Sequence, residues 1–269
     1  MASTFSHLAT FLLVISSFDW SLVPQVSSQR FINRRVWKEA DSVIPPKKEH
    51  KATIFFLHNI HNSGVSMRYW WQLVMPDSQF EHIKLVFPNG VRSYYAPLIG
   101  MERLAWYNQQ GIGPEYPELR NDTYEIAKHG LNLLVKEETD WYNITTDKII
   151  IGGFDQGGTM AMHMAFREMK NIGGCFALSS YLCHDSILYK ELPVVDNKEL
   201  TEPKLPYLFY VNGKKDPKIK LEWAQETFKR LERRGVKGEF HIDGNVTYEL
   251  KKLELYQLRN WAIKRLGVD

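Results

Sequence analysis

The residues with the clearest chemical meaning lie in Gly153-Phe154-Asp155-Gln156-Gly157. An apolar, β-branched run at 148–152 precedes them and the apolar segment 157–165 follows them, which predicts a buried strand, a sharp turn and a helix. Such a turn forces its central side chain outward at the N-terminus of the helix, where it can meet a substrate. In the motif G-x-S-x-G this residue is a nucleophilic serine, but here it is Asp155. A glycine-rich loop of an ordinary doubly wound sheet is the alternative for this pattern alone.

Further motifs follow in a fixed order along the chain: Phe55-Phe56-Leu57-His58 with Ser63-Gly64, Phe87-Pro88, Arg92-Ser93-Tyr94, Ile150-Ile151-Gly152-Gly153-Phe154, Phe176-Ala177-Leu178-Ser179-Ser180, and Gly213 with Asp216. With these motifs, residues 51–266 resemble the acyl-protein thioesterases, in particular their lysophospholipase-like branch. The resemblance implies an α/β-hydrolase fold, with a mostly parallel, doubly wound sheet and helices on both faces. It also implies a Ser-Asp-His triad, an oxyanion hole and an acyl groove, and no cofactor is expected.

The positions at which this family carries its triad are occupied here by Asp155, Asp216 and Tyr248. Only the acid, Asp216, is of the family's residue type. By the same resemblance, the oxyanion hole is formed by the backbone N–H groups of Ile60 and Gln156, which do not depend on side-chain identity. The glycine-rich loop of the family becomes 57–62, in which side chains replace glycines.

Asp155 is expected to be ionised at pH 7 without a base, because the reference pKa of aspartate is about 3.9. It could be a nucleophile, as in the haloalkane dehalogenases and epoxide hydrolases, which the chain resembles at this position only. The resulting ester would need a base that activates water, and Tyr248, with a reference pKa of about 10, is a poor one. His241 is the only histidine after Asp216, and we interpret it as a structural residue of a strand rather than as a displaced base.

These substitutions predict a catalytically inactive homologue of an acyl-protein thioesterase. It would act as a binding or regulatory protein, with an acyl or lipid-like ligand in the groove and a protein partner that the sequence does not name. The alternative is an active ester or thioester hydrolase that uses Asp155 as its nucleophile. We also hypothesise that the Asp155 carboxylate itself accepts the N–H groups of Ile60 and Gln156, because a helix N-terminus favours an anion.

Hydrophobic patterning independently predicts an α/β protein. Strands are expected at 53–57, 84–88, 148–154, 176–180, 208–211 and 239–242, and helices at 221–231 and 250–266. Strands that alternate with helices imply a mostly parallel sheet. We divide the chain into a signal peptide at 1–28, an N-terminal arm at 29–50 and one α/β-hydrolase domain at 51–269.

Features of the chain point to the secretory pathway. Residues 8–15 are an apolar core too short to span a membrane, and Val26-Ser27-Ser28 offers a small-residue cleavage site. No transmembrane segment is predicted. Glycosylation sequons begin at Asn121, Asn143 and Asn245. We therefore expect a glycoprotein that is secreted or lies in the lumen of the pathway.

Other classes of function find little support in the sequence. The net charge is +3, with basic residues scattered among acidic ones, so no nucleic-acid binding is expected. No metal site is predicted. Two pairs of side chains could contribute ligands, His58 with His61 and Asp155 with Asp216, but each pair lacks further ligands nearby.

Aromatic residues cluster at 69–71, 94–95 and 106–107. By resemblance these segments border the acyl groove, although packing in the core is the alternative for most of them. A retained groove could bind a lipid without any triad.

Overall fold

The structure, a computed structural model, describes residues 37–268 except 61, 78, 96, 98–100, 120–121, 193, 195–203 and 245–246. Its strands are β1 (Val43–Ile44), β2 (Ala52–Leu57), β3 (Ile83–Val86), β4 (Val91–Tyr95), β5 (Met101–Ala105), β6 (Asn108–Gln109), β7 (Glu118–Leu119), β8 (Ile149–Phe154), β9 (Gly174–Leu178), β10 (Tyr207–Gly213) and β11 (Gly238–Asp243). Its helices are α3 (Gly64–Val74), α4 (Asp122–Tyr142), α5 (Gln156–His163), α6 (Ile187–Glu191), α7 (Leu221–Glu232) and α8 (Lys252–Leu266). Short helical turns are η3 (Ala40–Ser42), η5 (Thr146–Lys148) and the π-helical η6 (Met164–Glu168).

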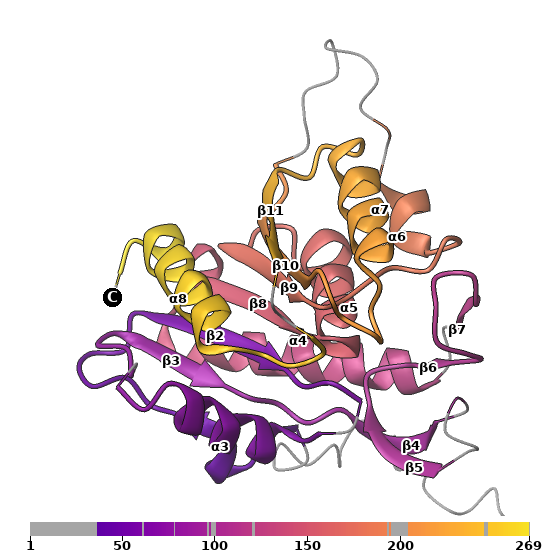
Figure 1. Ribbon diagram of the computed structural model, residues 1–269. Coiled ribbons are helices and arrows are strands. Elements are labelled where there is room, and N and C mark those ends of the chain that lie inside the picture. Colours follow the sequence, from indigo (N-terminus) through magenta and orange to yellow (C-terminus); the bar gives the residue numbers. More distant parts are fainter. Residues whose placement is uncertain are drawn as a thin grey trace, which may run out of the picture. The chain divides into compact units, whose positions relative to one another are not determined.

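The centre of the fold is a seven-stranded sheet in the order β1-β3-β2-β8-β9-β10-β11 (Figure 1). Within it β1 runs antiparallel to β3, and the other neighbouring strands are parallel. Strands β2, β8 and β9 are buried along their whole length, as expected for strands covered on both faces. The carboxyl ends of parallel strands meet at one edge, so the residues after β2, β8 and β10 come together there.

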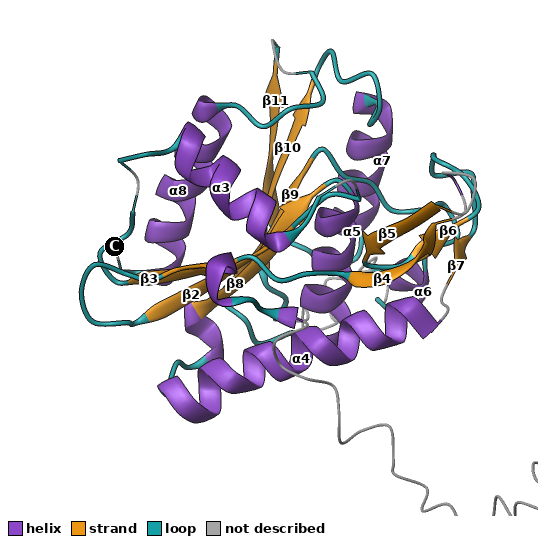
Figure 2. Ribbon diagram, turned by 90° about the horizontal axis from the view of Figure 1, so that it is seen from below, coloured by secondary structure: helices purple, strands orange, loops and turns teal. Residues whose placement is uncertain are grey.

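Alternate side chains of the strands pack against two layers of helices. On one face, Ile54 and Phe56 belong to the same core cluster as Trp261 of α8. On the other face, the Thr53 hydroxyl donates a hydrogen bond to Glu138 of α4 at 2.7 Å. Figure 2 shows α3 and α8 on one side of the sheet and α4 and α5 on the other. The predicted α/β fold, mostly parallel and with helices on both faces, is confirmed.

The strands expected from the hydrophobic patterning all exist, with ends shifted by one or two residues. The helices expected at 221–231 and 250–266 are α7 and α8. The paired strands β4 with β5 and β6 with β7 were not expected. They lie outside the main sheet. A strand such as β4, which is partly exposed, does not need a continuous run of apolar residues, so the sequence pattern does not reveal it.

Part of the segment before residue 51 contributes to the sheet. Within the expected arm at 29–50, β1 pairs with β3 at the edge of the sheet. Trp37 is also buried, and its ring lies so close to Gly130 that a Cβ there would come within 2.4 Å. A two-residue edge strand has too little periodicity to be recognised in a sequence. The expected signal peptide at 1–28 lies outside the described residues.

Candidate functional site

Asp155 lies between β8 and α5 in a strained turn. Its φ of 55° and ψ of −122° fall outside the regions that L-residues normally occupy. Glycines leave room for the neighbouring backbone: a Cβ at Gly153 would lie 2.5 Å from the Leu57 carbonyl oxygen, and one at Gly157 would lie 2.2 Å from it. The sharp turn predicted from the sequence is therefore formed, and it carries the Asp155 side chain to the wall of a cavity.

Donors from three segments of the chain hold the Asp155 carboxylate. The Tyr248 hydroxyl donates to Asp155 Oδ2 at 2.7 Å. The backbone N–H groups of Gln156 and Ile60 lie near enough to lower the pKa of the carboxylate. The N–H interactions are looser than the Tyr248 bond, because the Asp155 side chain forms no cap hydrogen bond with α5. Burial raises the pKa of Asp155 from 3.8 to about 6, although Tyr248, both N–H groups and the charge of Lys218 lower it.

Tyr248 lies where the resemblance expects a histidine. Its ring packs against Phe154 with 4.9 Å between ring centroids, and its hydroxyl accepts a hydrogen bond from Asn59 Nδ2 at 3.4 Å. Burial, followed by the charge of Asp155, raises the pKa of Tyr248 above its usual value. Tyr248 therefore keeps its proton at neutral pH and acts as a hydrogen-bond donor to Asp155.

Asp216, where the resemblance expects the triad acid, lies in the loop after β10. Its Oδ1 accepts the backbone N–H groups of Lys218 and Ile219, both at 2.9 Å. Its Oδ2 is buried and has no hydrogen-bond partner in the described part of the chain. An imidazole at position 248 has two ring nitrogens and could serve both Asp216 and residue 155. A tyrosine hydroxyl has a single proton. Tyr248 uses it in the hydrogen bond to Asp155, so Oδ2 of Asp216 has no hydrogen-bond donor in the described part of the chain.

A cavity of about 420 Å³ lies over Asp155, within the range of small-molecule sites. Its wall is largely aromatic and aliphatic, and it consists of Ile60, Tyr95, Tyr107, Gln109, Ile112, Asp155, Gln156, Thr159, Tyr181, Pro217, Lys218, Ile219, Lys220, Trp223 and Tyr248. A larger hollow of about 890 Å³ runs along α7, but it shares no residue with this cavity and is lined mainly by charged and polar side chains. The cavity over Asp155 is therefore the candidate site.

The side chain of Gln156 has a role that sequence reasoning missed. Its Oε1 accepts the backbone N–H of Trp106 at 2.9 Å, and its Nε2 donates to the Tyr107 carbonyl oxygen at 2.9 Å. These bonds fix the segment 105–107 against the start of α5, and Tyr107 lines the cavity. The aromatic run at 106–107 was the only sequence signal for this contact.

His58 is a structural residue of the altered oxyanion loop. Its Nδ1 donates to the Asn59 carbonyl oxygen at 2.7 Å, and its Nε2 accepts the backbone N–H of Gly90 at 2.9 Å. Burial lowers the pKa of His58 to about 4, which keeps the ring neutral. Since both nitrogens are engaged, His58 has no lone pair left for a metal ion. His61, the other metal candidate considered, lies outside the described residues.

His241 lies away from the cavity. It is in β11 opposite Val211, its ring contacts Phe209 with 5.1 Å between centroids, and its Nε2 is 3.7 Å from a carboxylate oxygen of Glu239. It is not among the residues that line the cavity. The interpretation of His241 as structural agrees with this placement.

The remaining expectations concern the surface of the protein. Asn143 is exposed at the end of α4, whereas Asn121 and Asn245 lie outside the described residues. Across the described ranges, no group of three or more His, Cys, Asp or Glu side chains is arranged to hold a metal ion. In the same part of the chain, no helix combines the length and the apolar character that a membrane span requires.

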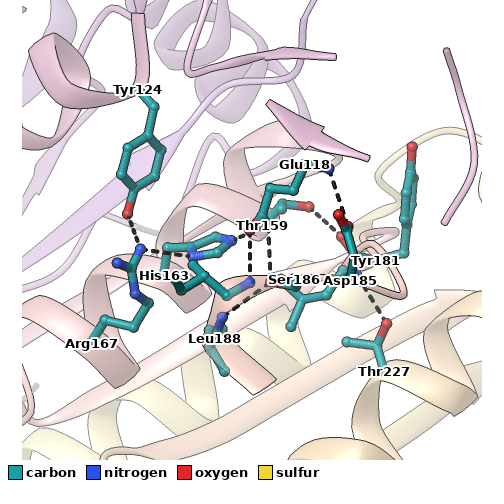
Figure 3. A network of polar contacts seen from close by, with 12 residues as sticks. Glu118, Tyr124, Thr159, His163, Arg167, Tyr181, Asp185, Ser186, Leu188 and Thr227 are labelled. Atoms are coloured by element: carbon teal, nitrogen blue, oxygen red, sulfur yellow. Dashed lines mark hydrogen bonds and ion pairs between the residues drawn. The ribbon is translucent and has the colours of Figure 1, made fainter. Parts of the chain in front are cut away.

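A buried polar network fixes α5 to its neighbours (Figure 3). Glu118 of β7 accepts hydrogen bonds from His163 Nε2 of α5 at 2.7 Å, from Ser186 Oγ at 2.9 Å and from the backbone N–H of Ile187 at 3.0 Å. Burial alone would raise the pKa of Glu118, but the charge of His163 and these bonds lower it to about 2. The helix that begins at the Asp155 turn is thereby held at its other end by an ionised carboxylate.

Comparison with known proteins places this geometry in a family. A match to the phospholipase/carboxylesterase family spans residues 38–261. Lysophospholipase-like protein 1 of Mus musculus is 34% identical over 225 residues, which cover 83% of this chain and 91% of the mouse protein. Acyl-protein thioesterase 1 homolog 1 of Dictyostelium discoideum is 28% identical and covers 71% of this chain and 80% of its own length.

Solved structures support the same fold. SOBER1 of Arabidopsis thaliana superposes with a TM-score of 0.69 at 19% identity and covers 80% of this chain and 99% of its own. Acyl-protein thioesterase 2 of Zea mays superposes with a TM-score of 0.68 at 20% identity and covers 84% of this chain and 98% of its own.

Proposed function

Since the chain belongs to the phospholipase/carboxylesterase family, we propose that it is a catalytically inactive member that binds an acyl or lipid-like ligand. The observation that carries this proposal is the 2.7 Å hydrogen bond from the Tyr248 hydroxyl to Asp155. This bond joins the positions of nucleophile and base through a group that keeps its proton at neutral pH.

Hydrolysis of an ester or thioester needs a base that accepts a proton and returns it to the leaving group. No histidine is found among the described residues that line the cavity. Asp216 is present, but the partner that it would orient is absent, as its buried Oδ2 suggests. Disabling such a unit lowers turnover by roughly 10⁶-fold.

The alternative function, hydrolysis with Asp155 as nucleophile, is favoured by one observation. With a pKa of about 6, Asp155 is mostly ionised at neutral pH and stands at the correct turn. However, the carboxylate is already engaged by the hydroxyl of Tyr248. Attack of Asp155 on the carbonyl carbon of an ester or thioester would release the alcohol or thiol and leave a mixed anhydride on Asp155. Among the described residues of the cavity wall, no histidine base is present to activate water for the hydrolysis of this anhydride, so the chain would stop at the acylated state.

The cavity itself supports binding without catalysis. Tyr95, Tyr107, Tyr181 and Trp223 supply apolar wall with a few polar groups between them, the composition that small-molecule sites favour. A regulatory role would in addition require a protein partner that responds to the occupied cavity.

The test is to restore the missing groups. We expect Asp155→Ser combined with Tyr248→His to gain labelling by a fluorophosphonate and turnover of a p-nitrophenyl ester at least ~10²-fold above either single variant, because nucleophile and base act as a unit. Thermal unfolding of all variants checks that they fold.

Steady turnover by the unchanged chain that disappears in Asp155→Asn would contradict the proposal, because it would identify Asp155 as a working nucleophile. A folded double variant that stays inactive would instead show that the oxyanion loop or the groove is also lost.

A further inference from the structure

Two lysine side chains stand at the rim of the cavity over Asp155. Lys218 and Lys220 belong to the loop between β10 and α7, both are exposed, and both line the cavity. Ile219 between them is buried. Neither ammonium group forms an ion pair with a carboxylate of the described residues, and each instead lies near an aromatic ring of the wall.

The structure fixes the positions of these lysines. The Lys218 Nζ lies 4.1 Å from the centroid of the Tyr248 ring, and the Lys220 Nζ lies 5.3 Å from that of Trp223. Asp216 Oδ1 holds the backbone of the loop through the N–H groups of Lys218 and Ile219. The retained acid of the former triad thus positions a loop that presents two positive charges.

Below these charges the cavity wall is apolar. Tyr95, Tyr107 and Tyr181 face it together with Ile60 and Ile112. The wall also contains the Asp155 carboxylate, which accepts a hydrogen bond from the Tyr248 hydroxyl and lies within the field of Lys218. The site therefore combines a largely apolar interior and one hydrogen-bonded carboxylate with two exposed cations. This arrangement complements a molecule that has an apolar body and a negative group at one end.

We propose that the cavity binds an amphiphile with one short apolar chain and an anionic head group, with the chain against the aromatic wall and the head group between Lys218 and Lys220. This inference rests on the proposed binding function and specifies its ligand. The head group is a carboxylate or a phosphate, as in a free fatty acid or a phosphate-headed single-chain lipid.

A cationic head group fits the site less well. Aromatic rings attract ammonium groups, but the lysines of the chain already lie at the rings of Tyr248 and Trp223. A second cation there would be repelled by both lysines. A neutral head group would gain nothing from them.

The experiment compares three head groups on the same chain. Isothermal titration calorimetry with octyl sulfate, 1-octanol and octyltrimethylammonium, each below its micelle-forming concentration, is expected to give the tightest binding for octyl sulfate and the weakest for octyltrimethylammonium. Titration of octanoate and octyl phosphate then distinguishes the two natural head groups. Inorganic phosphate alone is expected to bind much more weakly than octyl phosphate.

Matched variants test the lysines. Lys218→Gln with Lys220→Gln is expected to weaken octyl sulfate binding roughly 2- to 30-fold, the product of about 1.4- to 5-fold for each of two exposed charge pairs, and to leave 1-octanol binding unchanged. Lys214→Gln with Lys215→Gln removes the same charge from the same exposed loop outside the cavity wall and serves as control. High salt should reduce the preference for octyl sulfate.

The outcomes separate this inference from the function on which it rests. Equal affinity for the three head groups, or the same loss in both lysine variants, would overturn the anionic head group while leaving a binding function in place. Absence of binding by every amphiphile to the folded chain would contradict both.

Discussion

At the scale of single residues, the exchange of a hydroxyl for a carboxylate at position 155 changes the energetics of the site. A serine is neutral when buried, whereas the folded protein must keep a carboxylate away from water. Burial is the largest influence on Asp155 and raises its pKa to about 6 despite the donors around it. The charged form of Asp155 is therefore less stable in the folded than in the unfolded chain.

The pH dependence of stability follows from this shift. A carboxyl whose pKa rises from 3.8 to about 6 on folding binds protons more tightly in the folded state, so it lowers stability as the pH rises through this window. We expect the free energy of unfolding of the wild type, relative to Asp155→Ser, to fall by about 2 kcal/mol between pH 4 and pH 7.5. Urea unfolding of both proteins across this range measures the difference.

The comparison of the wild type with Asp155→Ser isolates the contribution of Asp155 to the pH dependence of stability, because the other titratable side chains are present in both proteins. The groups that interact with Asp155 come from several elements: Tyr248, Lys218, Tyr95 and Tyr181. Glu254, whose pKa burial raises to about 7, also makes stability depend on pH, but equally in the two proteins. Parallel curves for wild type and variant would show that Asp155 is not buried as described.

Sequence alone could locate the exchanged residues but not their contact. The motif around Asp155 and the matching positions of Asp216 and Tyr248 follow from the order of residues along the chain. The bond between Tyr248 and Asp155 depends on the distance between two loops that are 93 residues apart, which no local pattern encodes. The unpartnered Oδ2 of Asp216 could not be predicted either, because it depends on the number of protons that Tyr248 can donate.

At the scale of elements, the short strand β7 has a larger structural role than its length suggests. Through Glu118 it joins α5, which begins at the Asp155 turn, to the N-terminal end of α6 (Figure 3). Sequence patterning missed β7 because two residues have no measurable period. A carboxylate that pairs with a histidine distant in sequence gives no local signal.

Removal of the charge of Glu118 should weaken this junction. We expect Glu118→Gln to destabilise the protein by about 3 kcal/mol, because an NH₂ group replaces one of the two oxygens that accept from His163, Ser186 and Ile187, which leaves a buried donor unpaired. The pKa of about 2 means that Glu118 stabilises the fold above the unfolded pKa and loses this effect as the pH falls towards 2. Thermal or urea unfolding at pH 7 measures the loss.

The control is Glu115→Gln, which removes the same charge from an exposed residue in the same segment. It should change the free energy of unfolding by less than about 0.5 kcal/mol. Equal effects of the two substitutions would indicate that the network contributes nothing specific.

At the scale of the whole molecule, the sheet and both helical layers match the fold of the solved structures to which the chain is similar. The long buried strands could be predicted because each is a continuous apolar run bounded by polar residues. The edge strand β1 and the strands β4 to β7 could not, because they are short or half exposed. Their pairing is determined by tertiary contacts rather than by local propensity.

Passage through the secretory pathway stays a prediction, and one surface feature gives it a direct test. Asn143 is exposed, with a φ of 54° in a region that asparagine tolerates. We expect the chain expressed in a eukaryotic host to appear in the medium with Gln29 as its first residue and a glycan on Asn143. N-terminal sequencing and mass spectrometry after deglycosylation check both points.

A pair of variants gives the control. Asn143→Gln should remove one glycan, whereas Asn132→Gln, an exposed substitution on α4 outside any sequon, should remove none. Retention of the unprocessed chain in the cytosol would contradict the prediction.

The bond between Tyr248 and Asp155 also bears on how easily evolution could recover an esterase from this chain. In a mutant with serine at position 155 only, Tyr248 cannot accept the proton of the serine hydroxyl. In a mutant with histidine at position 248 only, an imidazole is paired with the Asp155 carboxylate. On the proposed function, neither single substitution restores ester cleavage, so selection for that activity has no first step to reward. An aspartate codon also differs from every serine codon at two or more nucleotides, so a return to serine at position 155 alone already requires more than one mutation.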